Sequence, residues 1–240
     1  MDEWEGRPDV IGALVTGSFA AGTASEHSDI DIHIILSDKV NWRERGNKIV
    51  DGFLIEYFAN PVRQILKYFD NDFRIGRHTD ARMFVIGKII FDKTGAVAKL
   101  RKRAHRDLKR PFAKPGKAWI ETVKYELWDN LDNLEELHHS RSRNFALMYN
   151  WQLARLAAIY ARYLRMEMPP ASRLYRYLSD GEFRKKYKIP LFPDKKFAAM
   201  ARNCMERSDF TAIEKLTRHV LQKMGGFEID GWKLNTPLAI

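Results

Sequence analysis

The stretch from Asp29 to Leu36 most constrains the fold, because it alternates polar residues with β-branched ones at a period of two. Such alternation predicts a β-strand, in which residues two apart point to the same face. Asp29 and Asp31 would then hold two carboxylates side by side in an otherwise apolar strand. Neighbouring carboxylates repel each other, and burial strengthens the repulsion. A divalent cation between them removes this cost, so the pair indicates a metal-dependent site.

A second buried strand is expected just before this one. Residues 9–16 form an almost continuous apolar run, and Gly17-Ser18 ends it. Glycine lets the backbone approach a ligand closely, and a helix begun by the next small residues would offer amides to phosphate. A Gly-Ser turn alone is weak evidence, because most such pairs only end strands. Strand pairing would nevertheless bring this turn and both aspartates to one end of a sheet.

Glu56 is a third candidate, within the apolar run Phe53–Phe58. A lone carboxylate in a buried strand is costly unless a cation or hydrogen bonds compensate it. Asp51-Gly52 precedes this run, and such a pair between two apolar runs predicts a β-hairpin. A third metal ligand, or a base for a substrate hydroxyl, would explain Glu56. The alternative is an edge strand with Glu56 facing water.

The composition shifts near residue 112. Before it, strand patterns alternate with helical ones; residues 41–48 are expected to be helical, and residues 83–91 to hold a strand at Lys88–Phe91. After it, apolar residues recur every three or four positions, which predicts long amphipathic helices. We expect a sheet-containing domain over residues 1–112 and an all-helical domain over residues 113–240, joined by a Pro- and Gly-containing linker at 111–116.

Composition limits the classes of protein further. The net charge is +10, which favours anionic partners but is also typical of a solvated basic surface. A single cysteine, Cys204, excludes an intrachain disulfide and favours a reducing, cytoplasmic setting. No apolar run approaches the roughly 20 residues of a membrane helix. We expect neither a membrane nor a nucleic acid as partner, since no aromatic-basic platform is evident.

These features together match a family. Gly17-Ser18, ten residues, Asp29-Ile30-Asp31, and Glu56 on a later strand resemble the nucleotidyltransferase superfamily of DNA polymerase beta. The finer pattern, with Ala20 and Gly22 after the Gly-Ser pair, is similar to its small bacterial members. The helical second half further resembles aminoglycoside and lincosamide nucleotidyltransferases, in architecture only.

The resemblance implies an α+β fold: a mixed sheet flanked by helices, followed by an all-α bundle. It also implies two Mg²⁺ ions and ATP or another nucleoside triphosphate as co-substrate. By this resemblance Gly17 and Ser18 would hold the triphosphate, Asp29 and Asp31 would bind both metals, and Glu56 would ligate the metal that activates the acceptor hydroxyl. Many relatives carry an arginine soon after the Gly-Ser pair, but Phe19 and Ala21 are apolar here. Cations elsewhere, such as those of the basic stretch 101–117, would have to contact the triphosphate.

The leading functional hypothesis is an enzyme that transfers a nucleoside monophosphate, AMP by preference, to a hydroxyl of a small-molecule acceptor, an antibiotic-type acceptor included. One alternative is an AMPylating enzyme of the antitoxin kind, whose acceptor is a protein. A second is a non-catalytic nucleotide-binding regulatory module, and a third is a template-independent RNA polymerase. The sequence leaves the acceptor, the preferred nucleotide and the oligomeric state open.

Overall fold

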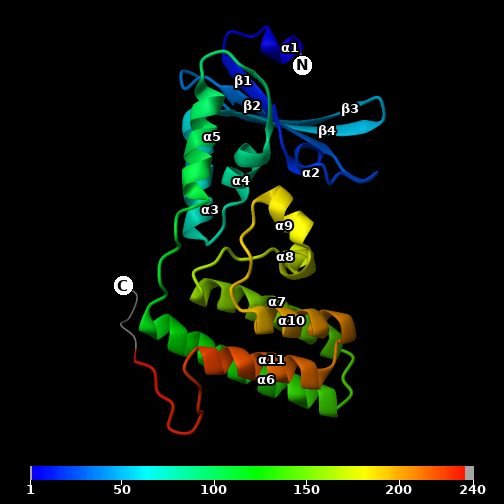
Figure 1. Ribbon diagram of the computed structural model, residues 1–240, viewed down its shortest axis with the longest axis vertical. Helices are drawn as coiled ribbons and strands as arrows, with labels where there is room; N and C mark the ends of the chain where they lie inside the picture. The colour runs from blue at the N-terminus through cyan, green and yellow to red at the C-terminus, as the bar shows by residue number, and fades with distance from the viewer. Residues whose placement is uncertain (1, 236–240) are drawn as a thin grey trace. The chain divides into compact units, whose positions relative to one another are not determined.

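The computed structural model describes residues 2–235, which divide into two compact units. The first unit runs to Arg110 and also includes Lys185–Ile189; the second comprises Pro111–Arg184 and the chain from Pro190 onward. Figure 1 shows strands and helices in the first unit and helices in the second. The predicted α+β class, with a mixed sheet followed by a helical region, is confirmed.

The first unit is built on a five-stranded sheet with the order β3-β4-β2-β1-β5. Only β2 and β4 run parallel; the other neighbouring pairs are antiparallel. The sheet is therefore mixed, and its central strands β2 and β1 are paired on both sides. The strands are β1 Val10–Val15, β2 Ile30–Leu36, β3 Glu44–Val50, β4 Phe53–Pro61 and β5 Lys88–Asp92.

Helices cover one face of this sheet, where α3 packs against β4 and α5 packs against β1 and β5 (Figure 1). Leu14 and Ile35 project into the core beneath them and meet Phe69 and Phe84. Ile32 and Ile34 point to the opposite face, as the period of two requires. The helices of this unit are α1 Asp2–Glu5, α2 Gly17–Ala21, α3 Val62–Arg74, α4 Thr79–Ile86 and α5 Ala96–Asp107.

The second unit buries one continuous apolar core. The long helix α6 packs against α7 and α11, and α10 packs against α7, α8 and α11. Leu127, Tyr149 and Leu156 are buried completely at its centre, as expected for amphipathic helices that turn their apolar faces inward. The elements are α6 Lys117–His139, α7 Phe145–Tyr163, a 3-10 turn at Ala171–Arg173, α8 Leu174–Ser179, α10 Lys195–Arg207 and α11 Phe210–Lys223. Helix α9, Gly181–Tyr187, begins in this unit, and its last three residues belong to the first.

One local sequence prediction is wrong. Residues 41–48 were expected to be helical, but β3 begins at Glu44, where the chain starts to pair with β4. The strand expected at Lys88–Phe91 is confirmed as β5. The residues just before it form the second half of α4, whose Phe84 side chain is buried under the sheet. The hairpin at Asp51-Gly52 is confirmed.

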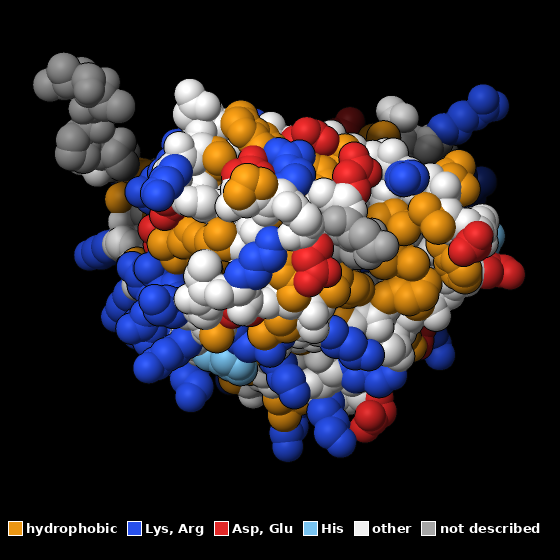
Figure 2. All heavy atoms as spheres, turned by 90° about the horizontal axis from the view of Figure 1, so that it is seen from above, with side chains coloured by type: hydrophobic (Ala, Val, Ile, Leu, Met, Phe, Trp, Pro, Cys, Tyr) orange, Lys and Arg blue, Asp and Glu red, His pale blue; other side chains and the backbone are white. Residues whose placement is uncertain are grey.

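Within residues 2–235, every helix is too short or too polar to cross a lipid bilayer. Blue Lys and Arg side chains outnumber red acidic ones on the face shown in Figure 2, in line with the net charge of +10. A basic surface of this kind favours anionic ligands.

Asp194 ties three elements of the helical unit together. Its Oδ1 accepts a hydrogen bond from the Phe197 amide at the start of α10, while its Oδ2 lies 2.7 Å from the Tyr160 hydroxyl and 2.8 Å from His219 Nε2. Burial opposes ionisation, but these hydrogen bonds outweigh it and lower the pKa of Asp194 to about 2. The ionised carboxylate therefore stabilises the folded state.

We predict that Asp194→Ala lowers the free energy of unfolding by about 3 kcal/mol at pH 7, because it removes a helix cap and leaves two buried polar groups without their acceptor. The folded-state pKa is depressed, so this stabilisation is present above about pH 4 and is lost as the pH falls toward 2. Urea unfolding across that range measures it. Asp209→Ala, which removes only the cap of α11, serves as the control; an equal loss in both variants would contradict the prediction.

Candidate active site

The turn between β1 and β2 brings the chain against the first carboxylates. The Thr16 amide donates to the Asp31 carbonyl at 2.8 Å, which fixes the end of β1 beside the start of β2. Gly17 follows with a positive φ of 64°, a conformation that glycine adopts without strain. A Cβ atom built on Gly17 would lie 1.9 Å from Asp31 Oδ2. Only glycine lets the turn and this carboxylate occupy their places together.

Asp29, Asp31 and Glu56 converge at this end of the sheet. The parallel register of β2 and β4 pairs Asp31 with Glu56, and Asp29 lies two residues before Asp31. One carboxylate oxygen from each residue lies within 4.8 Å of the other two. All three side chains are half-buried. The structure thus brings together the three acids that the sequence singled out.

This arrangement has the chemistry of a metal site. Three carboxylates at such separations repel one another, and partial burial weakens the screening by water. A hard divalent cation such as Mg²⁺ takes carboxylate oxygens as ligands and is commonly completed by substrate phosphates. The donor set therefore fits Mg²⁺, and the half-buried position leaves room for further oxygen ligands from a substrate.

Arg45, on the neighbouring strand β3, lies against the third carboxylate. Its Nε donates to Glu56 Oε1 at 2.9 Å, and its Nη2 contacts the same oxygen. The guanidinium also lies 5.0 Å from the centre of the Phe58 ring, a cation–π contact. The Arg45 side chain is 68% exposed, whereas that of Glu56 is 16% exposed. The guanidinium can therefore swing away into solvent, while the carboxylate is held in place by its neighbours.

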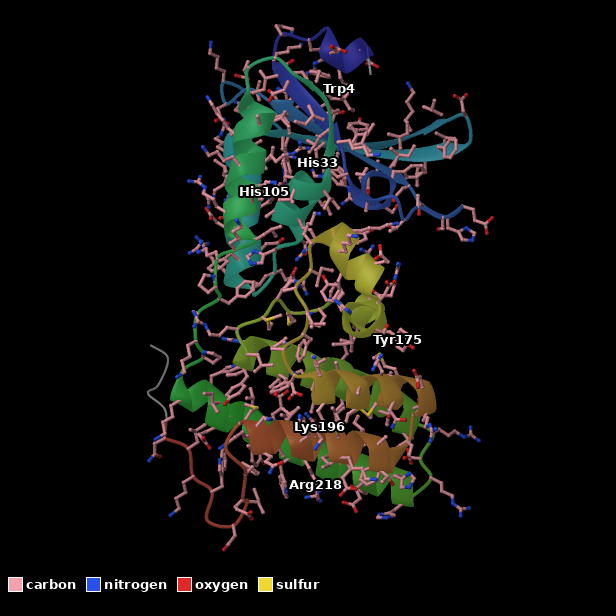
Figure 3. The ribbon with its side chains drawn as sticks, in the orientation of Figure 1. Trp4, His33, His105, Tyr175, Lys196 and Arg218 are labelled. Carbon is pink, nitrogen blue, oxygen red and sulfur yellow. The ribbon has the colours of Figure 1, made fainter. Side chains whose placement is uncertain are left out.

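A cavity of about 460 Å³ opens next to this pair, between the sheet and helices α3 and α4. Arg45 and His33 both line it. His33, labelled in Figure 3, stacks on Phe58 with ring centres 5.2 Å apart, and its Nε2 is buried without a partner among the described residues. Burial lowers the pKa of His33 to about 4, so its ring is neutral at pH 7.

Asp80 forms part of the opposite wall of the cavity. Burial, together with the nearby Asp72 carboxylate, raises the pKa of Asp80 to about 6. Above that pH the cavity offers a negatively charged acceptor on the α4 side and two arginines, Arg43 and Arg45, on the β3 side. It is therefore suited to a polar ligand that both donates and accepts hydrogen bonds.

The sequence singled out five residues at this corner of the sheet, but not Arg45 or the other charged residues that line the cavity. The structure places Gly17, Asp29, Asp31 and Glu56 together, with Ser18 following Gly17 in α2. Arg45 was missed because its segment was expected to be helical, and a helix would have given it no strand partner. The available signal was the Asp51-Gly52 turn itself. A hairpin needs a strand on each side of its turn, and Glu44-Arg45 lies in the strand before it.

Comparisons with known proteins identify a family for the first part of the chain. Residues 2–85 match the sequence profile of the nucleotidyltransferase domain family. No curated protein matches the chain. Among solved structures, the chain is similar to a nucleotidyltransferase-like protein from Exiguobacterium sibiricum 255-15, with 12% sequence identity, a TM-score of 0.37, and coverage of 92% of this chain and 77% of that one.

The matched residues contain the Gly17-Ser18 turn, all three acids and Arg45. Residues 2–85 are therefore a nucleotidyltransferase domain, and the predicted superfamily is confirmed. The match indicates nucleotidyl transfer as the class of activity of this domain. The resemblance to aminoglycoside-modifying relatives in particular stays a prediction.

The close approach of Gly17 to Asp31 generates a prediction. In Gly17→Ala the new Cβ would force the Asp31 carboxylate away from the other acids, so we expect Mn²⁺ affinity, measured by electron paramagnetic resonance, to fall at least about tenfold. Gly76→Ala is a matched control, because Gly76 also has a positive φ, 78°, but open space around its Cβ position. Equal affinity in both variants would mean that the approach of Gly17 to Asp31 is irrelevant to the metal.

Proposed function

We propose that the protein transfers a nucleoside monophosphate, AMP by preference, from a nucleoside triphosphate to a hydroxyl of a small-molecule acceptor, with Mg²⁺ as cofactor. The observation that carries this proposal is the convergence of Asp29, Asp31 and Glu56 beside Gly17 in a nucleotidyltransferase domain. The single cysteine, which is buried, accords with a cytoplasmic setting.

The roles follow from the order of the strands. Asp29 and Asp31 lie at the start of β2, which separates β1 and its Gly17 turn from β4 and Glu56. Asp29 and Asp31 would hold both metal ions, and Glu56 would be a ligand of the one on its own side. Gly17 and Ser18 would hold the triphosphate on the β1 side. The acceptor would then approach from the β4 side.

Bound Mg²⁺ would supply Lewis-acid stabilisation of the attacking and leaving oxygens. The chain's own residues position the reactants. The acceptor oxygen would form a bond to the α-phosphorus as the bond between that phosphorus and the bridging oxygen breaks. Pyrophosphate would leave, and the acceptor hydroxyl would pass its proton to solvent water. Gly17, which has no Cβ atom, lies directly against the Asp31 carboxylate, so a triphosphate held by this turn would lie close to the metal ligands. In-line geometry requires the acceptor on the side opposite to pyrophosphate.

The cavity between β2, β4 and α4 supports this assignment of sides. It adjoins Glu56 through Arg45, which contacts the carboxylate and also lines the cavity. Its volume of about 460 Å³ lies within the range of sites that hold small molecules. We therefore place part of the acceptor there, with its reacting hydroxyl directed toward Glu56.

The central test is a Mg²⁺-dependent pyrophosphate-release assay with a panel of hydroxyl acceptors. We predict that Asp29→Asn and Asp31→Asn each lower the rate at least about 100-fold, since the amide keeps the size of the side chain but loses the charge that binds the metal. Asp51→Asn, in the β3–β4 turn, is the control and retains full activity. Activity that survives both site substitutions would refute the proposed function.

Arg45 gives a separate prediction about the metal. Its positive charge lies on Glu56, so Mg²⁺ must compete with it for that carboxylate. Because Arg45 is largely exposed, the effect is modest: Arg45→Gln lowers the Mg²⁺ concentration for half-maximal binding by about threefold. Arg43→Gln, whose arginine bonds Tyr68 rather than a carboxylate, leaves that concentration unchanged. A rise in the Arg45 variant would show that Mg²⁺ does not displace the arginine.

A further inference from the structure

The first unit contains a short segment from far along the sequence. The chain leaves this unit at Arg110, and residues 111–184 belong to the helical unit, yet Lys185–Ile189 pack with the first unit again. From Pro190 the chain once more belongs to the helical unit. We call Lys185–Ile189 the return segment. Ordering a segment this way costs conformational entropy, which specific contacts must offset.

The return segment contacts the loop that joins α2 to β2. The hydroxyl oxygens of Tyr187 and Thr23 lie 2.8 Å apart, and Tyr187 is buried, with only 7% of its surface exposed. The Lys186 ammonium donates to the Gly22 carbonyl at 2.7 Å. Two consecutive residues of the segment therefore hold two consecutive residues of the loop.

Arg82, in α4, holds the return segment from the other side. It is 6% exposed, and its Nη1 donates to the carbonyls of Tyr187 at 2.6 Å and Lys188 at 3.0 Å. Hydrogen bonds from a buried guanidinium are stronger than those between neutral groups. The segment is thus anchored to a packed helix and in turn supports the loop.

The loop leads directly to the nucleotide side of the site. The Thr23 amide donates to the Ser18 carbonyl at 2.9 Å, and the Gly22 amide donates to the Phe19 carbonyl at 3.2 Å. Gly22 and Thr23 thus lie one helical turn from Gly17-Ser18. The intervening helix α2 has five residues, none of them fully buried, and no side-chain cap at Thr16. A helix this short is unstable without tertiary support.

We propose that Lys186 and Tyr187 are positioning residues of the nucleotide site, which hold the Gly22–Thr23 corner so that Gly17-Ser18 keep the conformation that binds the triphosphate. This inference rests on the proposed function for its catalytic consequence, but its structural part does not. Nucleotide binding would then depend on the return segment, which lies in the sequence between two parts of the helical unit.

The test compares Tyr187→Phe, Lys186→Met and Thr23→Val with Lys185→Met. The control removes the same charge from a side chain that, within residues 2–235, forms no hydrogen bond or ion pair with the loop. Amide hydrogen exchange of residues 17–28, measured without substrate, is expected to quicken in the first three variants and to stay unchanged in the control.

In the pyrophosphate assay, the same three variants are expected to raise the KM for ATP about fivefold while kcat stays within about twofold. A variant with both Tyr187→Phe and Thr23→Val is no worse than either single one, because the two share one hydrogen bond.

Unchanged exchange of residues 17–28 in both Tyr187→Phe and Lys186→Met overturns the inference, whether or not the protein turns over ATP. It is also overturned if Lys185→Met raises the KM as much as Lys186→Met, or if the variants lower kcat with the KM unchanged. Failure of the unsubstituted chain to release pyrophosphate with any acceptor bears on the proposed function instead, and the exchange experiment still decides whether the return segment orders the loop.

Discussion

The parallel pairing of β2 with β4 places Asp31 opposite Glu56, and the rest of the site depends on this register. A shift of the register by one residue would turn Glu56 to the other face of the sheet. With the register as it is, three carboxylates face one another across less than 5 Å. In the folded protein Arg45 neutralises Glu56, which offsets part of this repulsion. A divalent cation bound among the three carboxylates can offset it in place of Arg45.

Local sequence patterns were sufficient for the parts of the site that lie on one strand or one turn. The alternation after Asp29 predicted the β2 strand and the shared face of Asp29 and Asp31, because side-chain direction in a strand depends only on its period. Glu56 was found because a carboxylate in an apolar run requires compensation. The Asp-Gly pair correctly predicted the β3–β4 hairpin, although the strand before it was read as a helix.

The remaining parts of the site depend on contacts that no local pattern encodes. Arg45 reaches Glu56 through strand pairing, and Tyr187 reaches Thr23 across 164 residues. The basic run around Lys186 gave no indication of which surface it would meet. The same limit explains α4, whose apolar run fits a strand or a buried helix equally well until the sheet it covers is known.

The most direct measurement is anomalous diffraction from crystals grown with Mn²⁺ and a non-hydrolysable ATP analogue. We predict two manganese peaks among the carboxylates of Asp29, Asp31 and Glu56, with the triphosphate against Gly17-Ser18 and Arg45 displaced from Glu56. Manganese peaks away from these three acids, or a triphosphate bound elsewhere, would contradict the assignment of this corner of the sheet as the site of nucleotidyl transfer.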